Sequence, residues 1–250
     1  MLTTQRRALI SARLSRDGEI VAKRLADELD LSEDTIRRDL REMAAEGLLQ
    51  RVHGGALPLV PPLPNFAARQ AIGSDVKRRL GQRAAAMIGA GQTIFLDGGT
   101  SNAEIARALP REKKLTVVTH SPTIAAELER HEAEVILIGG RLYKHSMVST
   151  GAAALAAIAG IRVDLFFLGV TAIHPAHGVS TGDFEEAAVK RAILAQAADT
   201  YVLATAEKFG AVSPHHVAGI ADLAGFIVPD EVKDEVLAPF DGTNVTMIGA

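Results

Sequence analysis

The chain has 250 residues, 48% of them hydrophobic, and a net charge of −3, so it can bury a substantial core and lacks the basic excess of proteins that coat nucleic acid. It contains no cysteine, which excludes disulfides, thiolate metal sites and cysteine nucleophiles. No apolar run follows the basic residues of the N-terminus and none reaches about 18 residues, so we expect neither a signal peptide nor a membrane span, and a soluble cytoplasmic protein.

A pair of short helices joined by a tight turn is predicted near the N-terminus, after an opening helix over residues 3–15. Apolar residues recur at helical spacing in the first helix of the pair, at Ile20, Val21, Leu25 and Leu29. The pattern breaks at Asp30, and Ser32 is a favourable N-cap for the next helix.

The second helix of the pair divides by angle into an apolar and a polar face. Ile36, Leu40 and Met43 recur at i, i+4 and i+7 and predict the buried stripe. Arg38 and Arg41 point away from that stripe, while Thr35 and Arg37 lie beside it. Arginines on such a helix are long enough to reach DNA phosphates or the O6/N7 edge of guanine in the major groove, so the pattern indicates a helix-turn-helix.

A wing is predicted directly after this helix, because a glycine turn at Gly54 and Gly55 separates two short strands. Residues 1–57 contain ten Lys or Arg and ten Asp or Glu, so positive charge must gather locally on one face. The spacing alone leaves open a plain helical hairpin with a solvated arginine face. The candidate DNA-binding residues are Ser32, Thr35, Arg37, Arg38, Arg41, Arg51 and His53.

The sequence DTIRRDLREMAAEGLLQRVHGGA resembles the signature of the DeoR family of bacterial repressors. The resemblance implies an N-terminal winged helix-turn-helix with a TIRRDL-type recognition helix and an R-x-H-G-G-A wing. It favours DNA binding over the plain hairpin, and it predicts that replacing Arg37 or Arg38 by Ala abolishes operator binding without unfolding the protein.

A proline-rich segment follows the wing, with four prolines between Pro58 and Pro64. Such a composition favours an extended, semi-stiff linker. We therefore predict a DNA-binding domain over residues 1–57, a linker over 58–65 and a second domain over 66–250 that begins with a helix over 66–89. A stiff linker can pass a rearrangement of the second domain on to the spacing of the DNA-binding domains.

The second domain alternates apolar strands with helices, which is typical of a largely parallel sheet covered on both faces. Strands are predicted at 93–96, 115–119, 135–138, 163–168 and 201–204, with shorter late strands at 226–228 and 245–248. Ligands of such sheets bind beyond the carboxyl ends of the strands, where the polar loops of this chain fall.

The loop Asp97–Ser101 leads from a strand into the N-terminus of a helix. Its glycines and hydroxyls suit a phosphate group, although a simple capped turn has the same composition. It is neither a Walker loop nor a dinucleotide-binding loop. A carboxylate in the segment 182–190 and Lys208 after the fifth strand would complete a site for a phosphorylated sugar.

The resemblance to the DeoR family extends through DGGTSNAEIA, VVTHSP, VILIGGRLYKHSMVSTG, DLFFLGVTAIHPAHGVSTGDFEEAAVKRAI and VLATAEKFG. It implies a sensor domain similar in fold to ribose-5-phosphate isomerase, which commonly binds phosphorylated sugars. By position it makes Asp97, Gly98, Gly99, Thr100 and Ser101 the phosphate-binding loop. It places Thr119, Gly140, Arg141, Asp183, Glu186 and Lys208 around the rest of the effector. The chain departs from the family pattern at Thr205, where an Asp is usual, and at His120, where an Asn is usual.

The sequence therefore predicts a transcriptional repressor without catalytic residues that binds a double-stranded DNA operator. We expect a homo-oligomer, a dimer or a tetramer, because a monomer with few phosphate contacts needs paired half-sites to bind tightly. A phosphorylated sugar or related effector would modulate operator binding. The alternatives are a phosphosugar isomerase with a DNA-binding appendage, with Glu186 as general base, and a structural nucleoid protein, which the acidic net charge disfavours. No cofactor and no metal are expected, because His174, His177, His215 and His216 lack carboxylates at chelating spacing and are predicted to be solvated.

Overall fold

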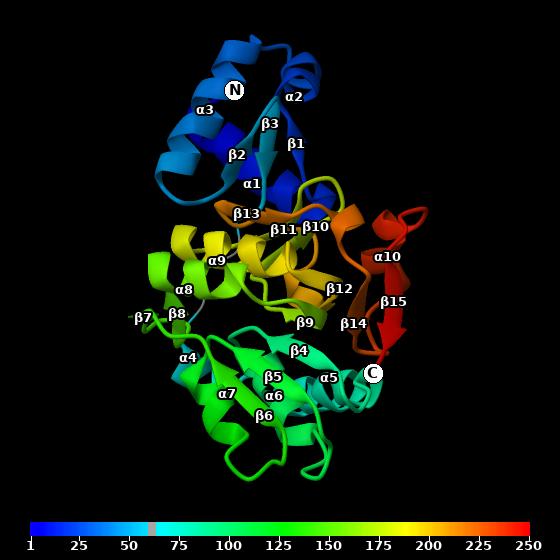
Figure 1. Cartoon of the computed structure of the whole chain (residues 1–250). Coiled ribbons are helices and arrows are strands. Elements are labelled where there is room, and N and C mark those ends of the chain that lie inside the picture. Colours follow the sequence, from blue (N-terminus) through cyan, green and yellow to red (C-terminus); the bar gives the residue numbers. More distant parts are fainter. Residues whose placement is uncertain (60–63) are drawn as a thin grey trace.

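Two lobes of unequal size form the computed structural model of the chain (Figure 1). The smaller lobe, drawn in blue, contains the N-terminal elements, and the larger lobe contains all later elements, with the C-terminus at its side. The structure describes residues 1–59 and 64–250, so residues 60–63 of the predicted linker lie outside the described residues.

Three helices and a three-stranded antiparallel sheet make up the smaller lobe, with strand order β1-β3-β2. Its core is apolar and includes Ile10, Leu25, Ile36, Leu40 and Met43, which confirms the buried stripe predicted for residues 36–43. The elements are α1 (Thr3–Asp17), β1 (Ile20–Val21), α2 (Ala22–Leu29), α3 (Glu33–Ala45), β2 (Gln50–Val52) and β3 (Gly55–Leu57).

The prediction that Ile20 and Val21 begin a helix is wrong, because these residues form β1 and pair with the wing strand β3. A Cβ at Gly55 would lie 1.8 Å from the Ile20 carbonyl oxygen, so this close pairing requires glycine at that position. The N–H of Ala22 then donates to the Gly54 carbonyl at 2.8 Å, and α2 starts there. Pairing with the wing thus overrides the helical spacing of these two β-branched residues.

A seven-stranded parallel sheet, in the order β15-β14-β12-β9-β4-β5-β6, forms the centre of the larger lobe and confirms the predicted fold class. The chain first builds outward from β4 through β5 to β6, and then returns to the other side of β4 with β9. The carboxyl ends of β4 and β9 therefore flank the point where the strand order reverses, the usual ligand position in such sheets. The strands are β4 (Thr93–Leu96), β5 (Thr116–Thr119), β6 (Glu134–Leu137), β9 (Val163–Leu168), β12 (Ala197–Leu203), β14 (Gly225–Val228) and β15 (Thr246–Gly249).

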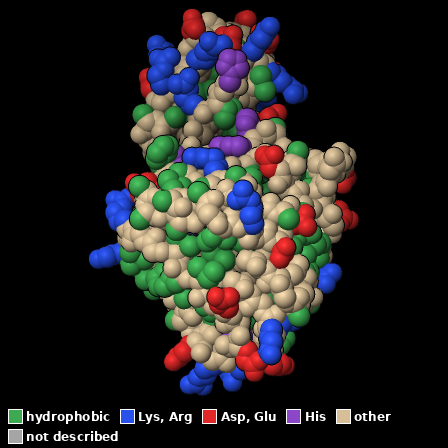
Figure 2. Space-filling model, viewed as in Figure 1, with side chains coloured by type: hydrophobic (Ala, Val, Ile, Leu, Met, Phe, Trp, Pro, Cys, Tyr) green, Lys and Arg blue, Asp and Glu red, His purple; other side chains and the backbone are tan. Residues whose placement is uncertain are grey.

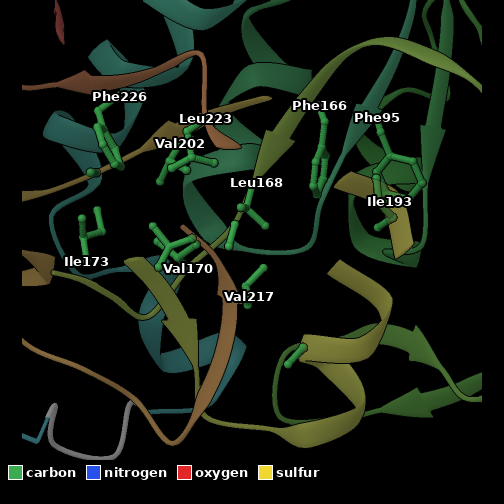
Figure 3. Close-up of a cluster of buried hydrophobic side chains, with 14 of the residues drawn as sticks. Phe95, Phe166, Leu168, Val170, Ile173, Ile193, Val202, Val217, Leu223 and Phe226 are labelled. Atoms are coloured by element: carbon green, nitrogen blue, oxygen red, sulfur yellow. The ribbon is translucent and has the colours of Figure 1, made fainter. Parts of the chain in front are cut away.

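Helices pack on both faces of this sheet, and strand residues alternate between two cores. Phe95 and Phe166 face one core, shown in Figure 3, whereas Ile94 and Phe167 face the other. The helices of the larger lobe are α4 (Phe66–Gln70), α5 (Ser74–Met87), α6 (Thr100–Ala108), α7 (Pro122–Glu127), α8 (Ala152–Ala159), α9 (Phe184–Leu194) and α10 (Asp234–Leu237), with the short 3-10 turns η1 (Ala206–Lys208), η2 (Ile220–Asp222) and η3 (Ala238–Phe240).

The single helix predicted over residues 66–89 is wrong, because the chain breaks between α4 and α5. Gly73 adopts a left-handed conformation, with φ 60°, immediately before α5. The Lys77 ammonium donates to the Arg69 carbonyl at 2.8 Å and also to the Ile72 carbonyl, so it satisfies carbonyls released at the end of α4.

Two small antiparallel sheets complete the larger lobe, and the sequence predicted neither. The sheet β10-β11-β13 lies beneath the smaller lobe (Figure 1), and β7 pairs with β8. His174 in β10 is only 8% exposed, so the expectation of a solvated loop is wrong for this histidine. The strands are β7 (Arg141–Tyr143), β8 (Val148–Thr150), β10 (Ala172–His174), β11 (Gly178–Thr181) and β13 (His215–Ala218).

The start of the predicted linker touches the larger lobe. Leu59 forms an isolated parallel bridge with Val212, whose N–H donates to the Pro58 carbonyl at 3.3 Å. On the far side of residues 60–63, the N–H of Phe66 donates to the His145 carbonyl at 2.9 Å. Within the described residues, no helix is both long and apolar enough to cross a membrane.

Candidate functional site

The N-terminus of α3 is fixed by the cap that the sequence predicted. The Ser32 hydroxyl oxygen accepts a hydrogen bond from the Thr35 N–H at 3.2 Å, and the two side-chain oxygens lie 2.9 Å apart. This cap satisfies one of the free N–H groups of the helix start and sets the first turn of α3.

The arginines of α3 all lie on its solvent side, but their pairing differs. Arg37 donates to the Glu33 carboxylate at 2.8 Å from Nη2 and 3.1 Å from Nε. Arg38 and Arg41 are exposed, and neither forms an ion pair within residues 1–59 and 64–250. An exposed ion pair contributes little free energy, so Arg37 can leave Glu33 to bind an anionic ligand. Arg38 and Arg41 can bind such a ligand without first breaking an ion pair.

The wing adds Arg51 and His53, both exposed, beside the same helix. Gly54 has φ 80°, the left-handed conformation that closes the turn between β2 and β3. The predicted DNA-binding residues thus lie on α3 and on the wing that follows it, and Figure 2 shows Lys and Arg side chains gathered on the smaller lobe.

Several acidic residues of the smaller lobe pair with arginines outside α3 and the wing. Arg6 and Asp39 form a buried ion pair, in which Arg6 Nη2 donates to Asp39 Oδ1 at 2.9 Å. Arg6 is therefore unavailable to a ligand at the surface. Arg13 and Arg24 pair with Glu28, and Arg7 pairs with Glu46. Within the described residues, Arg38, Arg41 and Arg51 are left without an ion-pair partner on α3 and the wing, as are the exposed acids Asp34 and Glu42 of α3.

A cavity of about 450 Å³ lies in the larger lobe beyond the carboxyl ends of β4 and β9, within the size range of small-molecule sites. Its lining includes the start of α6, the loop after β9, the start of α9, and η1. Residues from the N-terminal side of the lobe, among them Leu59, Pro64 and Arg69, also line it.

Seven of the eleven predicted effector residues line this cavity. Gly98 and Gly99 have distinct roles in shaping the loop. A Cβ at Gly98 would lie 2.0 Å from Val148 Cγ1, and Gly99 has φ 134°, which side chains rarely adopt. The first N–H groups of α6 lack intrahelical partners and belong to the cavity wall. The seven residues are Gly98, Gly99, Thr100, Ser101, Asp183, Glu186 and Lys208.

Asp97 does not line the cavity but lies beneath it, fully buried. Its Oδ2 accepts from the Lys190 ammonium at 2.6 Å and the Gly169 N–H at 2.7 Å, while Oδ1 accepts from the Gly98 N–H at 2.8 Å. Burial opposes ionisation, but Lys190 and His120 outweigh it and lower the pKa of Asp97 to about 2. Asp97 therefore holds the loop from inside, because its acceptor positions are already occupied.

His120 is also buried and belongs to this internal network, not to the cavity wall. Its Nε2 lies 2.7 Å from Asp97 Oδ1 and its Nδ1 lies 2.9 Å from the Ser149 carbonyl oxygen. His120, where an Asn is usual in the family, thus contacts the Asp97 carboxylate and not the cavity. Thr205, the other departure, does line the cavity, and its hydroxyl donates to Glu207 Oε1 at 2.6 Å.

Three further predicted residues lie outside the cavity lining. The Thr119 hydroxyl is buried and donates to the Leu96 carbonyl at 2.7 Å, so it joins two neighbouring strands. Gly140 packs where a Cβ would lie 2.7 Å from the Thr150 carbonyl oxygen. Arg141 is exposed and pairs with Glu185. The sequence identified the blocks but could not tell their supporting residues from their lining residues.

The acids on the cavity wall are held by α9. Asp183 caps that helix by accepting from the Glu186 N–H at 2.9 Å. Glu186 Oε1 lies 3.3 Å from the Lys190 ammonium, which connects the wall to the Asp97 network. Lys190 also lines the cavity but was not predicted, although its i, i+4 spacing from Glu186 could have indicated the pair.

The cations on the cavity wall are the main difference from the sequence prediction. Lys208 was predicted to lie around the effector, but Arg69 and Lys77 were not. Burial lowers the pKa of Lys208 to about 8, and Lys77 and Arg69 contribute to the shift against the opposing effect of Glu207. The break between α4 and α5 brings Arg69 and Lys77 to one wall, and no periodicity in the sequence marks it.

Two family models match the chain. A DeoR-like helix-turn-helix domain matches residues 6–59, and a DeoR C terminal sensor domain matches residues 73–230.

Three curated proteins are similar over most of their length. The chain is 31% identical to the HTH-type transcriptional regulator GlpR of Haloferax volcanii over 250 residues, covering 99% of this chain and 98% of that protein. It is 33% identical over 224 residues to the HTH-type transcriptional regulator FruR of Bacillus subtilis, covering 89% of each chain. It is 32% identical over 212 residues to the glycerol-3-phosphate regulon repressor of Escherichia coli, covering 84% of each.

Solved structures with a related arrangement include ribose 5 phosphate isomerase A from Neisseria gonorrhoeae, with a TM-score of 0.39 and 15% identity over 53% of this chain and 52% of that one. The full-length sorbitol operon regulator SorC from Klebsiella pneumoniae has a TM-score of 0.41 and 14% identity over 82% of this chain and 90% of that one.

Proposed function

Since the chain belongs to the DeoR family of DNA-binding transcriptional regulators, we propose that it represses genes of carbohydrate metabolism and that a phosphorylated sugar or related metabolite modulates its operator binding. The names of similar proteins support the choice of metabolite, because one of them is a glycerol-3-phosphate regulon repressor. A repressor acts on chromosomal DNA, so the proposal locates the protein in the cytoplasm.

The observation that carries the proposal is the pairing pattern on α3. Arg38 and Arg41 are exposed and free of ion pairs within the described residues, while the apolar stripe opposite them is buried. In this proposal α3 enters the major groove, with Arg38 and Arg41 on bases or phosphates and the Ser32 and Thr35 hydroxyls near the backbone. Arg51 and His53 of the wing contact the flanking DNA.

The cavity suits a ligand with one anionic end and several hydroxyls. The α6 N-terminus, with Gly98–Ser101, and Lys208 provide N–H donors and positive charge for a phosphate. The carboxylates of Asp183 and Glu186 provide acceptors for sugar hydroxyls. This combination supports a phosphorylated sugar over an uncharged sugar or a metal-bound ligand.

We place the domain boundaries at residues 57 and 66, with the proline-rich segment between them as the connection through which the larger lobe positions the DNA-binding lobe. A single lobe offers few free cations, so its affinity for DNA is modest. In the proposal a homo-oligomer of larger lobes presents two or more α3 helices to paired half-sites, which raises avidity without new contacts.

In this proposal the protein binds its ligand and does not convert it chemically. Glu186 already contacts Lys190 at 3.3 Å and accepts from the Ser146 hydroxyl at 3.3 Å, so it is held as part of the wall. Turnover of aldose and ketose phosphates by the purified protein would instead support the isomerase alternative.

The test of the proposal is binding of Arg38→Ala to the DNA that the wild-type protein selects from a random duplex pool. We expect a loss of affinity of at least about tenfold, equivalent to about 1.4 kcal/mol, with an unchanged melting temperature. Arg162→Ala removes an exposed arginine of the larger lobe and serves as the matched control. Equal affinity of Arg38→Ala and Arg162→Ala would overturn the assignment of α3.

A further inference from the structure

Three cations from separate segments share the cavity wall without an ionic partner. They are Arg69 in α4, Lys77 in α5 and Lys208 in η1. Within residues 1–59 and 64–250, none of them forms an ion pair. Lys77 and Lys208 donate to backbone carbonyls, and the buried Nε and Nη2 atoms of Arg69 have no hydrogen-bond partner among those residues.

Such a cluster is unfavourable while the cavity is empty. Burial lowers the pKa of Arg69, of Lys77 and of Lys208, and Arg69 and Lys77 lower the pKa of Lys208 further. Buried donors without acceptors and neighbouring like charges both raise the free energy of the folded state. An anion with several acceptor oxygens would relieve both costs at once, because it neutralises the charges and accepts from the unpaired guanidinium.

The position of Arg69 connects this cluster to the smaller lobe. Arg69 lies in the first helix after the proline-rich segment, and that helix is tied down by the Phe66 N–H, which donates to the His145 carbonyl at 2.9 Å. Leu59 and Pro64, from the two described ends of the same segment, line the same cavity. The wall that carries Arg69 therefore also contains residues from the two described ends of the connection to the DNA-binding lobe.

We propose that Arg69, Lys77 and Lys208 bind the phosphate group of the effector and that Arg69 thereby couples occupancy of the cavity to the docking of Pro58, Leu59 and residues 64–69 against the larger lobe. The inference rests on the proposed function and adds its regulatory route. Occupancy favours the docked arrangement, and by reciprocity the docked arrangement raises affinity for the anion. The coupling free energy equals the difference in the free energy of anion binding between the docked and the undocked arrangement.

Hydrogen exchange gives a direct readout of docking. The Val212 N–H donates to the Pro58 carbonyl, and the Phe66 N–H donates to the His145 carbonyl, so both amides are protected only while the connection is docked. We expect inorganic phosphate, and more strongly glycerol 3-phosphate, to slow exchange at Val212 and Phe66 in the full-length protein. Glycerol serves as the uncharged control ligand. Phosphate binding without slower exchange at these amides would overturn the coupling.

The variants Arg69→Gln and Arg69→Lys test the anion site by calorimetry and by thermal shift with the same two anions. We expect Arg69→Gln to bind at least about tenfold more weakly and to lose the exchange effect, and Arg69→Lys to recover part of the affinity. Arg83→Gln, an exposed arginine of α5 outside the cavity lining, is the matched control. Without ligand, Arg69→Gln should be at least as stable as wild type, because a buried unpaired cation has been removed.

The outcomes separate the two proposals. Wild-type binding that Arg69→Gln leaves unchanged would overturn the anion site and leave the repressor proposal standing. No binding of inorganic phosphate, glycerol 3-phosphate or phosphorylated sugars by the wild-type protein would overturn both the anion site and the choice of effector class.

Discussion

The cations of α3 and the cations of the cavity differ in their surroundings. Arg38 and Arg41 are exposed and unpaired within the described residues, so water solvates them and leaving them without a partner costs little. Arg69 and Lys208 are partly enclosed and also lack carboxylate partners. Without a ligand in the cavity, these cations therefore carry a desolvation cost in the folded state. The α3 arginines can bind a polyanion without a change in the fold. The cavity cations make the stability of the folded protein depend on a ligand.

Each lobe also contains a buried anion that neutralises a buried cation. Asp39 neutralises Arg6 inside the smaller lobe, and Asp97 neutralises Lys190 inside the larger one. Both pairs are buried, although Lys190 also lines the cavity. Each lobe therefore uses one buried pair for structure and keeps other cations free for binding.

Removing the internal anion of the larger lobe should have the largest effect. Asp97→Ala leaves Lys190 and His120 without their shared acceptor and frees two backbone N–H groups, so we expect the unfolding free energy to fall by about 3–5 kcal/mol. Urea denaturation measures the loss. The control Asp199→Ala, at an exposed position, should change stability by less than about 0.5 kcal/mol. A loss below about 1 kcal/mol in Asp97→Ala would show that the network does not support the loop.

A pH series on Lys208→Met sharpens the comparison for the enclosed cations. The pKa of Lys208 is lowered from 10.5 to about 8, so the folded protein releases this proton at lower pH than the unfolded chain. Lys208 should therefore contribute a rise of stability with pH between about 8 and 10.5, by up to about 1.4 kcal/mol per pH unit. The variant loses this rise, whereas Lys233→Met, an exposed control, keeps it. Parallel urea midpoints for wild type and Lys208→Met across this window would contradict the prediction.

The smallest effect is expected at the exposed pair of α3. Glu33→Gln releases Arg37 and removes a negative charge beside the proposed DNA surface, but it also removes an acid from the helix N-terminus. We expect a change in stability of less than about 1 kcal/mol. DNA affinity should rise by roughly threefold at most, as measured by fluorescence anisotropy, with Glu129→Gln as the control. A fall in affinity would mean that Glu33 positions Arg37 for DNA.

Local chemistry made the smaller lobe predictable. The Ser32 cap and the stripe of Ile36, Leu40 and Met43 were read from residues three or four apart, and the structure confirms both. The failure at Ile20 and Val21 has a non-local cause, since their partner strand lies more than 30 residues later, at Gly55 and Ala56. Helical spacing carries no information about such a partner.

The candidate site was predictable only in part. Strand ends identified Gly98–Ser101 and Lys208 as cavity residues, because a parallel sheet brings its carboxyl ends to one edge. The same reasoning included Asp97, and the family resemblance added Thr119, although both residues are fully buried. Arg69 and Lys77 were missed because a break at Gly73, within a segment expected to be one helix, brings them to the cavity wall.

The sequence by itself determined the periodic features of this protein: the amphipathic recognition helix, the alternation of strands with helices, and the polar loops at the strand ends. Each depends on the side-chain period of a single element, which neighbouring residues fix. Only the tertiary structure decided which charges are buried in pairs and which line a cavity unpaired. That choice depends on the solvent exposure of each group and on partners such as Asp97 and Lys190, which lie 93 residues apart in the chain.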